Sequence, residues 1–163
     1  MKRFLLVLAL FTTALLPFST AQAAELEEDP LLKEVNALLI ENRGIAGTIA
    51  TKLGIAYSTT KPGTGTLPEM NNALFIRNQI LFKQIAAKLG VIVETATPFD
   101  GSLIEQNHQI LLGNRVVTLA ILETLGLEAK PGFPMKGNLV EKNRDILLAN
   151  REALKSIAMK LGA

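Results

Sequence analysis

The chain has no cysteine and no tryptophan, and it has one tyrosine and one histidine among 163 residues. Without cysteine it can form no disulfide, no thiolate metal site and no lipid-modified cysteine of the bacterial lipoprotein type. One histidine is too few for a metal site built from several imidazoles. The shortage of aromatic rings leaves little for stacking on nucleotide bases or sugars.

The N-terminal segment, residues 1–23, has the three parts of a secretory signal peptide. Lys2 and Arg3 give a positive start, residues 4–18 are an apolar run, and residues 21–23 read Ala-Gln-Ala, a cleavage site. The run is short for a transmembrane helix, which needs about 20 apolar residues. We therefore expect export to the periplasm or the exterior by a cleaved signal peptide.

Charge is balanced once this segment is removed. The whole chain has 17 Lys and Arg against 15 Asp and Glu; Lys2 and Arg3 leave with the signal peptide, so 15 of each sign remain. A net charge of zero gives no support for a nucleic-acid partner. Residues 24–30 open the mature chain as an acidic tail, which we expect to be solvated.

The rest of the chain, residues 31–163, is a fourfold repeat with a period of 36 residues. A glycine recurs at this spacing: Gly54, Gly90, Gly126 and Gly162. An asparagine recurs in the same way: Asn42, Asn78, Asn114 and Asn150. The linker prolines keep the register as well: Pro62, Pro98 and Pro134. No insertion or deletion breaks it, so we expect one domain of four equivalent units.

Each unit predicts one helix, because start and stop signals stand at fixed offsets. Thr66, Ser102 and Asn138 are N-cap residues, and a glutamate follows each one three residues later, as in a capping box. In the first unit Asp29 and Pro30 replace this device. The repeated glycines suit the left-handed residue after a helix end. The expected helices are 31–53, 67–89, 103–125 and 139–161, joined by long linkers that contain Pro and Gly.

One face of each expected helix is apolar. On a helical projection, Leu74, Leu81 and Ile85 lie close to Asn78, and the other units repeat this stripe with the spacing of a coiled coil. Four helices that each bury one stripe predict an all-α, four-helix bundle. Antiparallel packing is the default for this fold. The linkers are also long enough for a parallel arrangement, which we keep as the alternative.

The repeated asparagines, Asn42, Asn78, Asn114 and Asn150, lie at the centre of the stripe and halfway along each helix. Three more lie one heptad earlier: Asn71, Asn107 and Asn143. A buried amide without a partner costs a few kcal/mol, so these amides must bond to one another, to water or to a ligand. The layer either sets helix register or anchors a ligand inside the bundle. If it sets register, Asn78→Leu should raise the thermal midpoint and loosen the association state.

A second, weaker apolar stripe lies on the opposite side of the helices. Its members are Ile40, Ile76, Ile80, Leu112, Val116 and Leu148. Two interpretations stay open. The side chains are either tolerated at the surface and under the linkers, or they contact another subunit, a partner helix or lipid.

No set of residues meets the requirements of catalysis or metal binding. His108 lies away from the apolar stripe, where we expect a surface residue, and no nucleophile and base can be assembled around it. Glu105 and His108 have the E-x-x-H spacing of di-iron bundles, but only once. No phosphate-binding glycine motif follows a strand. The sequence therefore predicts no enzyme, no metal site and no cofactor.

Two classes of function remain. The first is an exported, non-catalytic helical repeat protein, periplasmic or secreted, that acts as a structural or protein-interaction module and binds itself or another protein. The second is a carrier for a small, largely apolar ligand inside the bundle. The apolar third unit also permits contact with a membrane surface, although zero net charge removes electrostatic help.

Overall fold

The structure, a computed structural model, describes residues 29–60, 63–93, 101–129 and 136–163. Most of these residues belong to four helices: α2 (Pro30–Lys52), α3 (Leu67–Lys88), α4 (Leu103–Thr124) and α5 (Leu139–Leu161). Every helix end lies within one residue of its expected position. The described residues form no strand, and the predicted all-α, four-helix bundle is confirmed. The signal peptide, most of the acidic tail and the three linker prolines lie outside the described residues.

The helices begin and end at the capping residues and glycines that the sequence predicts. Capping boxes begin α3, α4 and α5; in the second of them the backbone N–H of Ser102 donates to Glu105 Oε2 at 2.9 Å. At the start of α2 the Asp29 carboxylate accepts from the backbone N–H of Leu31, and Pro30 is the first helical residue. The repeated glycine after each helix has φ between 65° and 76°, a conformation that glycine adopts without strain.

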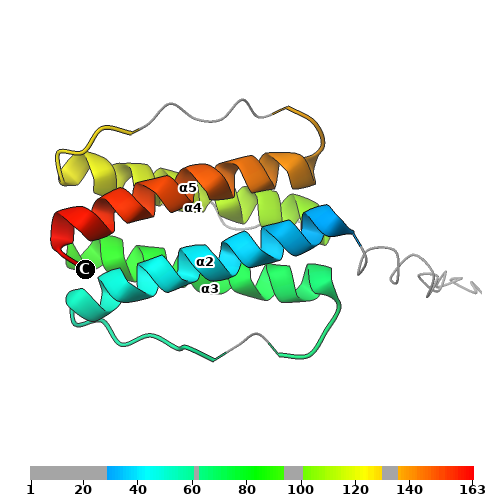
Figure 1. Cartoon of the computed structure of the whole chain (residues 1–163), viewed down its shortest axis with the longest axis horizontal. Helices are drawn as coiled ribbons and strands as arrows, with labels where there is room; N and C mark the ends of the chain where they lie inside the picture. Colours follow the sequence, from blue (N-terminus) through cyan, green and yellow to red (C-terminus); the bar gives the residue numbers. More distant parts are fainter. Residues whose placement is uncertain (1–28, 61–62, 94–100, 130–135) are drawn as a thin grey trace, which may run out of the picture.

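All four helices run in the same direction (Figure 1). α2 and α5 lie on the near side of the view, α3 and α4 lie behind them, and every helix begins at the same end of the bundle. The antiparallel default is therefore wrong, and the parallel alternative is the correct one. A helix of 22 or 23 residues is about 34 Å long. An extended linker of about 13 residues spans roughly 43 Å, enough to return along the whole bundle.

The helices form a closed ring. α2 and α4 each pack against both α3 and α5, and among these described helices the diagonal pairs make no close contact. Asn36 Nδ2 donates to Asn71 Oδ1, and Asn72 Nδ2 donates to Asn107 Oδ1, both at 2.7 Å and both across 35 residues. Between α2 and α3 the bond from Arg43 to Asn78 also spans 35 residues, and only parallel neighbours keep one sequence separation at two levels. The repeat in the sequence thus becomes a pseudo-fourfold axis along the bundle.

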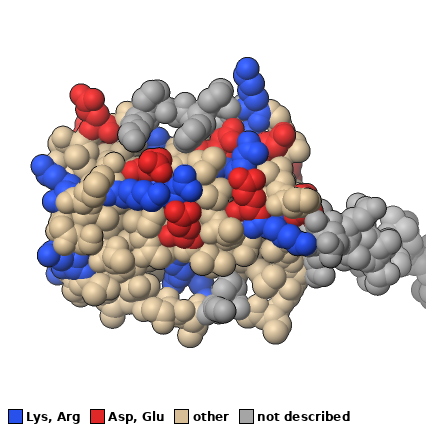
Figure 2. All heavy atoms as spheres, viewed as in Figure 1, with Lys and Arg blue, Asp and Glu red and all other residues tan. Residues whose placement is uncertain are grey.

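The ring closes between α5 and α2, the last and first helices, without a linker to join them. Ion pairs bridge this groove: Glu41 of α2 lies 3.4 Å from Arg151 and 3.7 Å from Lys155 of α5. Figure 2, drawn from the same side as Figure 1, shows acidic and basic side chains intermixed over this near face. Opposite charges on the two helices therefore help to close the ring.

The core consists of two hydrophobic clusters, one on each side of the asparagine level. The cluster nearer the helix starts includes Leu39, Leu74 and Leu111. The cluster nearer the helix ends includes the repeat-equivalent residues Ile49, Ile85, Ile121 and Ile157. Complete burial of one such side chain stabilises the fold by about 1.5–3 kcal/mol. The predicted apolar stripes are thus the surfaces that meet at the axis.

The first linker packs over the groove between the helices it joins. Tyr57 lies against Gly47 of α2. A Cβ at position 47 would collide with the tyrosine hydroxyl, so the phenol side chain can lie there only because residue 47 is glycine. Arg43 of α2 and Arg77 of α3 donate to linker carbonyls, Arg77 to that of Thr60 at 2.9 Å. These bonds hold the described part of the linker against both helices.

Candidate functional site

The four central asparagines lie at one level of the bundle and are at most 1 % exposed. Asn78 Nδ2 donates to the backbone carbonyl of Leu39 at 3.1 Å, and Asn42 Nδ2 donates to that of Leu147 at 3.0 Å. Each carbonyl belongs to the preceding helix of the ring, three residues before the asparagine of that helix. The amides therefore bond around the ring to backbone groups, a partner that the sequence analysis did not consider.

Arginines of the preceding helix reach two of the amide oxygens. Arg43 Nη1 lies 3.4 Å from Asn78 Oδ1, and Arg115 Nη1 lies 3.3 Å from Asn150 Oδ1. Both are long hydrogen bonds, but they supply a charged donor to a buried oxygen. Sequence reasoning missed these arginines. The available signal was arginine at the same repeat position in three of the four units, at 43, 115 and 151.

Three buried polar atoms of the layer have no partner within the described residues: Asn42 Oδ1, Asn114 Oδ1 and Asn150 Nδ2. Two of them follow from departures from the repeat. The residue placed to reach Asn114 is Gln79, where the other units have arginine. Arg151 is placed to reach Asn42 but pairs instead with Glu41 and Glu152. Nothing in the structure explains the unpaired Asn150 Nδ2.

The second asparagine layer, Asn71, Asn107 and Asn143, is also buried. Asn36 and Asn72 donate to Asn71 and Asn107 of this layer, and at the third asparagine His108 Nδ1 lies 2.7 Å from Asn143 Oδ1. His108 is thus partly buried and bonded, and the expectation of a plain surface residue was wrong. This layer has three asparagines and not four, because the equivalent residue of α2 is Val35. Arg144, which is placed to face Val35, pairs with Asp145.

Both layers direct their bonds along the ring and not toward its axis. The described donors of the central layer that have partners reach carbonyl groups of neighbouring helices. This geometry supports the register interpretation, because the bonds form only when neighbouring helices are parallel and level. It gives less support to a ligand anchored on these amides.

The second apolar stripe divides into two groups. Ile40, Ile76, Ile80 and Val116 are 41–54 % exposed. Leu112 and Leu148 are partly buried and pack against the hydrophobic cluster near the helix starts. Ile76 and Ile80 lie one turn apart on the outer face of α3, so they form a single apolar patch. Val116 occupies on α4 the position that Ile80 has on α3.

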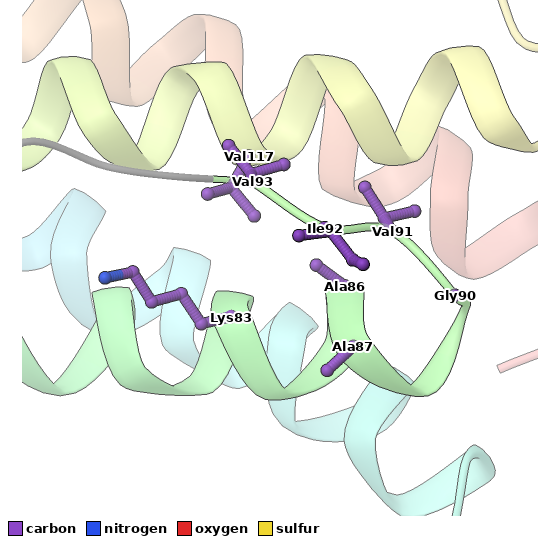
Figure 3. Close-up of a pocket in the computed structure, with 8 residues that line it drawn as sticks. All are labelled: Lys83, Ala86, Ala87, Gly90, Val91, Ile92, Val93 and Val117. Carbon is purple, nitrogen blue, oxygen red and sulfur yellow. The ribbon is translucent and has the colours of Figure 1, made fainter.

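A pocket of about 700 Å³ lies between α3, α4 and the segment that follows α3 (Figure 3). In the close-up, Val93 lies next to Val117 of α4, and Lys83 extends from α3 at one side. Apart from Lys83 its lining is apolar: Ala86, Ala87, Gly90, Val91, Ile92, Val93 and Val117. No asparagine of the two layers is among the residues that line this pocket.

The described residues contain no group of three or more His, Cys, Asp and Glu side chains that could hold a metal ion. None of the four described helices is long and apolar enough to cross a membrane. The chain matches no protein-family model, no curated protein and no solved structure.

Proposed function

We propose that the chain is an exported, non-catalytic helical repeat protein that acts as a structural or protein-interaction module. The observation that carries this proposal is the apolar patch of Ile76 and Ile80 on the outer face of α3. Contiguous exposed apolar side chains commonly mark a protein contact. The partner is a second copy of the chain or another protein.

Two further features support a binding module. The buried polar groups of the core bond mostly to the bundle itself, which leaves the outer face as the place for a partner. Val116 extends the apolar character to the neighbouring helix α4 at the same level. A rigid ring of parallel helices holds such side chains at fixed spacing, as a contact surface requires.

Site-specific photo-crosslinking in the cells that produce the protein tests this proposal. A crosslinking residue at position 80 should give a protein adduct of defined mass, and so should one at position 76. Position 128 is the control, because Glu128 is an exposed polar residue on a linker. Adducts at 80 that are no stronger than those at 128 would contradict the proposal. Native mass spectrometry of the purified protein then separates a second copy from another partner.

Export is tested separately by N-terminal sequencing of the protein recovered from the periplasm or the medium. A chain that starts at Ala24 would support cleavage after residue 23. Recovery of the intact N-terminus from the cell interior would count against export.

The second candidate is a carrier for a small, largely apolar ligand. The observation that favours it is the apolar pocket between α3 and α4. Its volume lies within the range of small-molecule sites, about 300–1,000 Å³. A reproducible added mass on the purified monomer, lost in Val117→Lys, would support this candidate. An unloaded monomer, exported and purified without detergent, would count against it.

A further inference from the structure

Arg43 and Arg77 come together between α2 and α3, beneath the first linker. Both line a pocket of about 320 Å³, together with Tyr57, Ser58 and Ile80 and with three further residues, Ala56, Leu81 and Gln84. Burial, and next the neighbouring Arg77 guanidinium, hold the pKa of Arg43 below its ordinary value. Two positive charges are therefore close enough to oppose each other.

Neither guanidinium has a carboxylate partner in the part of the chain that the structure describes. Arg43 bonds to the amide oxygen of Asn78 and to the backbone carbonyl of Ser58, and Arg77 bonds to the backbone carbonyl of Thr60. All three partners are neutral oxygens. A guanidinium has five N–H donors, so both side chains retain donors for a further acceptor.

The repeat supplies an internal comparison for this pair. In the groove between α5 and α2, the positions equivalent to Arg43 and Arg77 are Arg151 and Glu41. There Arg151 Nη1 lies 3.4 Å from Glu41 Oε2, and Lys155 Nζ lies 3.7 Å from Glu41 Oε1. The same geometry thus places a carboxylate beside the arginine in one groove and a second cation in the other.

The remaining two grooves place no second cation at these positions. Their equivalent pairs are Gln79 with Gly113, and Arg115 with Ala149. The facing arginines are therefore particular to the groove between α2 and α3. That groove also has the sole tyrosine of the chain, and Tyr57 places its ring 6.0 Å from the Arg43 guanidinium carbon.

We propose that this groove binds the carboxylate of a small organic acid between Arg43 and Arg77, with the apolar part of the ligand against Tyr57. The bound carboxylate supplies the countercharge that Glu41 supplies to Arg151. The planar N–H fork of arginine matches the two oxygens of a carboxylate. A pocket of 320 Å³ is at the small end of ligand sites, which favours a short acid such as a medium-chain alkanoate. This inference does not depend on the proposed function.

Tyrosine fluorescence reports on this pocket alone, since Tyr57 is the single tyrosine and tryptophan is absent. Titration of the purified protein with sodium octanoate should change the emission saturably in or below the millimolar range and raise the thermal midpoint. Acetate lacks the apolar part and should bind at least about tenfold more weakly. No saturable change with octanoate would overturn the proposal. Inorganic phosphate that binds as tightly as octanoate would overturn the assignment to an organic acid.

Variants separate the site from a general effect of charge. Arg77→Gln should weaken octanoate binding at least about tenfold, and Arg77→Lys, which keeps the charge but not the planar fork, should restore only part of that loss. Arg77→Glu places a carboxylate where Glu41 stands in the other groove, and should abolish binding while raising the midpoint of the ligand-free protein. The matched control is Arg115→Gln, which removes the same charge from the repeat position of Arg43 and should leave binding unchanged. Equal weakening by Arg115→Gln and Arg77→Gln would overturn the proposal.

Discussion

Asn78 of α3 is bonded twice to the helix before it. Its amide nitrogen donates to the Leu39 carbonyl of α2 at 3.1 Å, and its oxygen accepts from Arg43 of α2 at 3.4 Å. A slip of one helical turn would move these partners by about 5.4 Å and break both bonds. A polar residue in the core thus ties two parallel helices at one level.

The unequal pairing of the asparagines leads to a first prediction. Asn114 Oδ1 is buried without a partner, whereas Asn78 has partners for both amide atoms. An unsatisfied buried polar group costs about 1–3 kcal/mol. Asn114→Leu removes an unpaired oxygen, whereas Asn78→Leu removes two bonds, so the Asn114→Leu protein should be about 1–2 kcal/mol more stable to unfolding than the Asn78→Leu protein. Urea unfolding measures this difference, and an equal or reversed order would contradict it.

The second prediction restores the missing arginine. Position 79 is the repeat equivalent of Arg43 and Arg115, which donate to Asn78 and Asn150. Gln79→Arg introduces an arginine there. A new bond to Asn114 Oδ1 should stabilise the protein by about 1 kcal/mol. The gain should vanish in an Asn114→Leu background, which the double-mutant cycle measures. A gain that persists there would show that the arginine acts in another way.

The third prediction concerns the closure of the ring. Glu41 pairs with Arg151 and Lys155, and all three side chains are partly exposed. Exposed pairs contribute little, so Glu41→Gln should lower the free energy of unfolding by less than about 1 kcal/mol. In about 1 M salt, where the screening length is about 3 Å, the loss should disappear. Glu128→Gln, on an exposed linker residue, is the charge-matched control. A loss that is insensitive to salt would argue against the ion pairs as its cause.

The fourth prediction concerns acid. The backbone N–H of Ser102, and next its hydroxyl, lower the pKa of Glu105, and the same groups of Thr66 lower the pKa of Glu69. Because the folded pKa lies below the unfolded value of about 4.3, the capping contribution is complete above that pH and is lost as the pH falls through the folded pKa. The thermal midpoint should therefore drop in this acid range.

Replacement of these glutamates tests the source of that drop. Glutamine keeps the capping geometry without the charge, so Glu69→Gln and Glu105→Gln should each make the acid loss shallower, and the double variant should do so further. The measurement is the thermal midpoint against pH for all four proteins. An unchanged acid profile in the double variant would contradict the assignment.

The helix ends were predictable because their signals act within a few residues. A cap such as Ser102 and its partner Glu105 satisfy the first turn locally, and a glycine such as Gly54 ends the last turn locally. The burial of Asn78 was predictable for a similar reason, since one helical projection places it among apolar residues. The partial burial of His108 was not, because a residue on the flank of the stripe is covered only by the neighbouring helix.

The sequence by itself determined four helices of defined length, one apolar face on each, and an asparagine at the same level in every unit. Only the tertiary structure decided that the helices are parallel and in which order they form the ring. Linkers that can reach either end allow both directions, and helical periodicity contains no information about a neighbour. The ring order then decides which side chains meet, so that Arg151 lies beside Glu41 while Arg43 faces a second cation in Arg77. Such pairings depend on distances across helices, which local sequence signals do not encode.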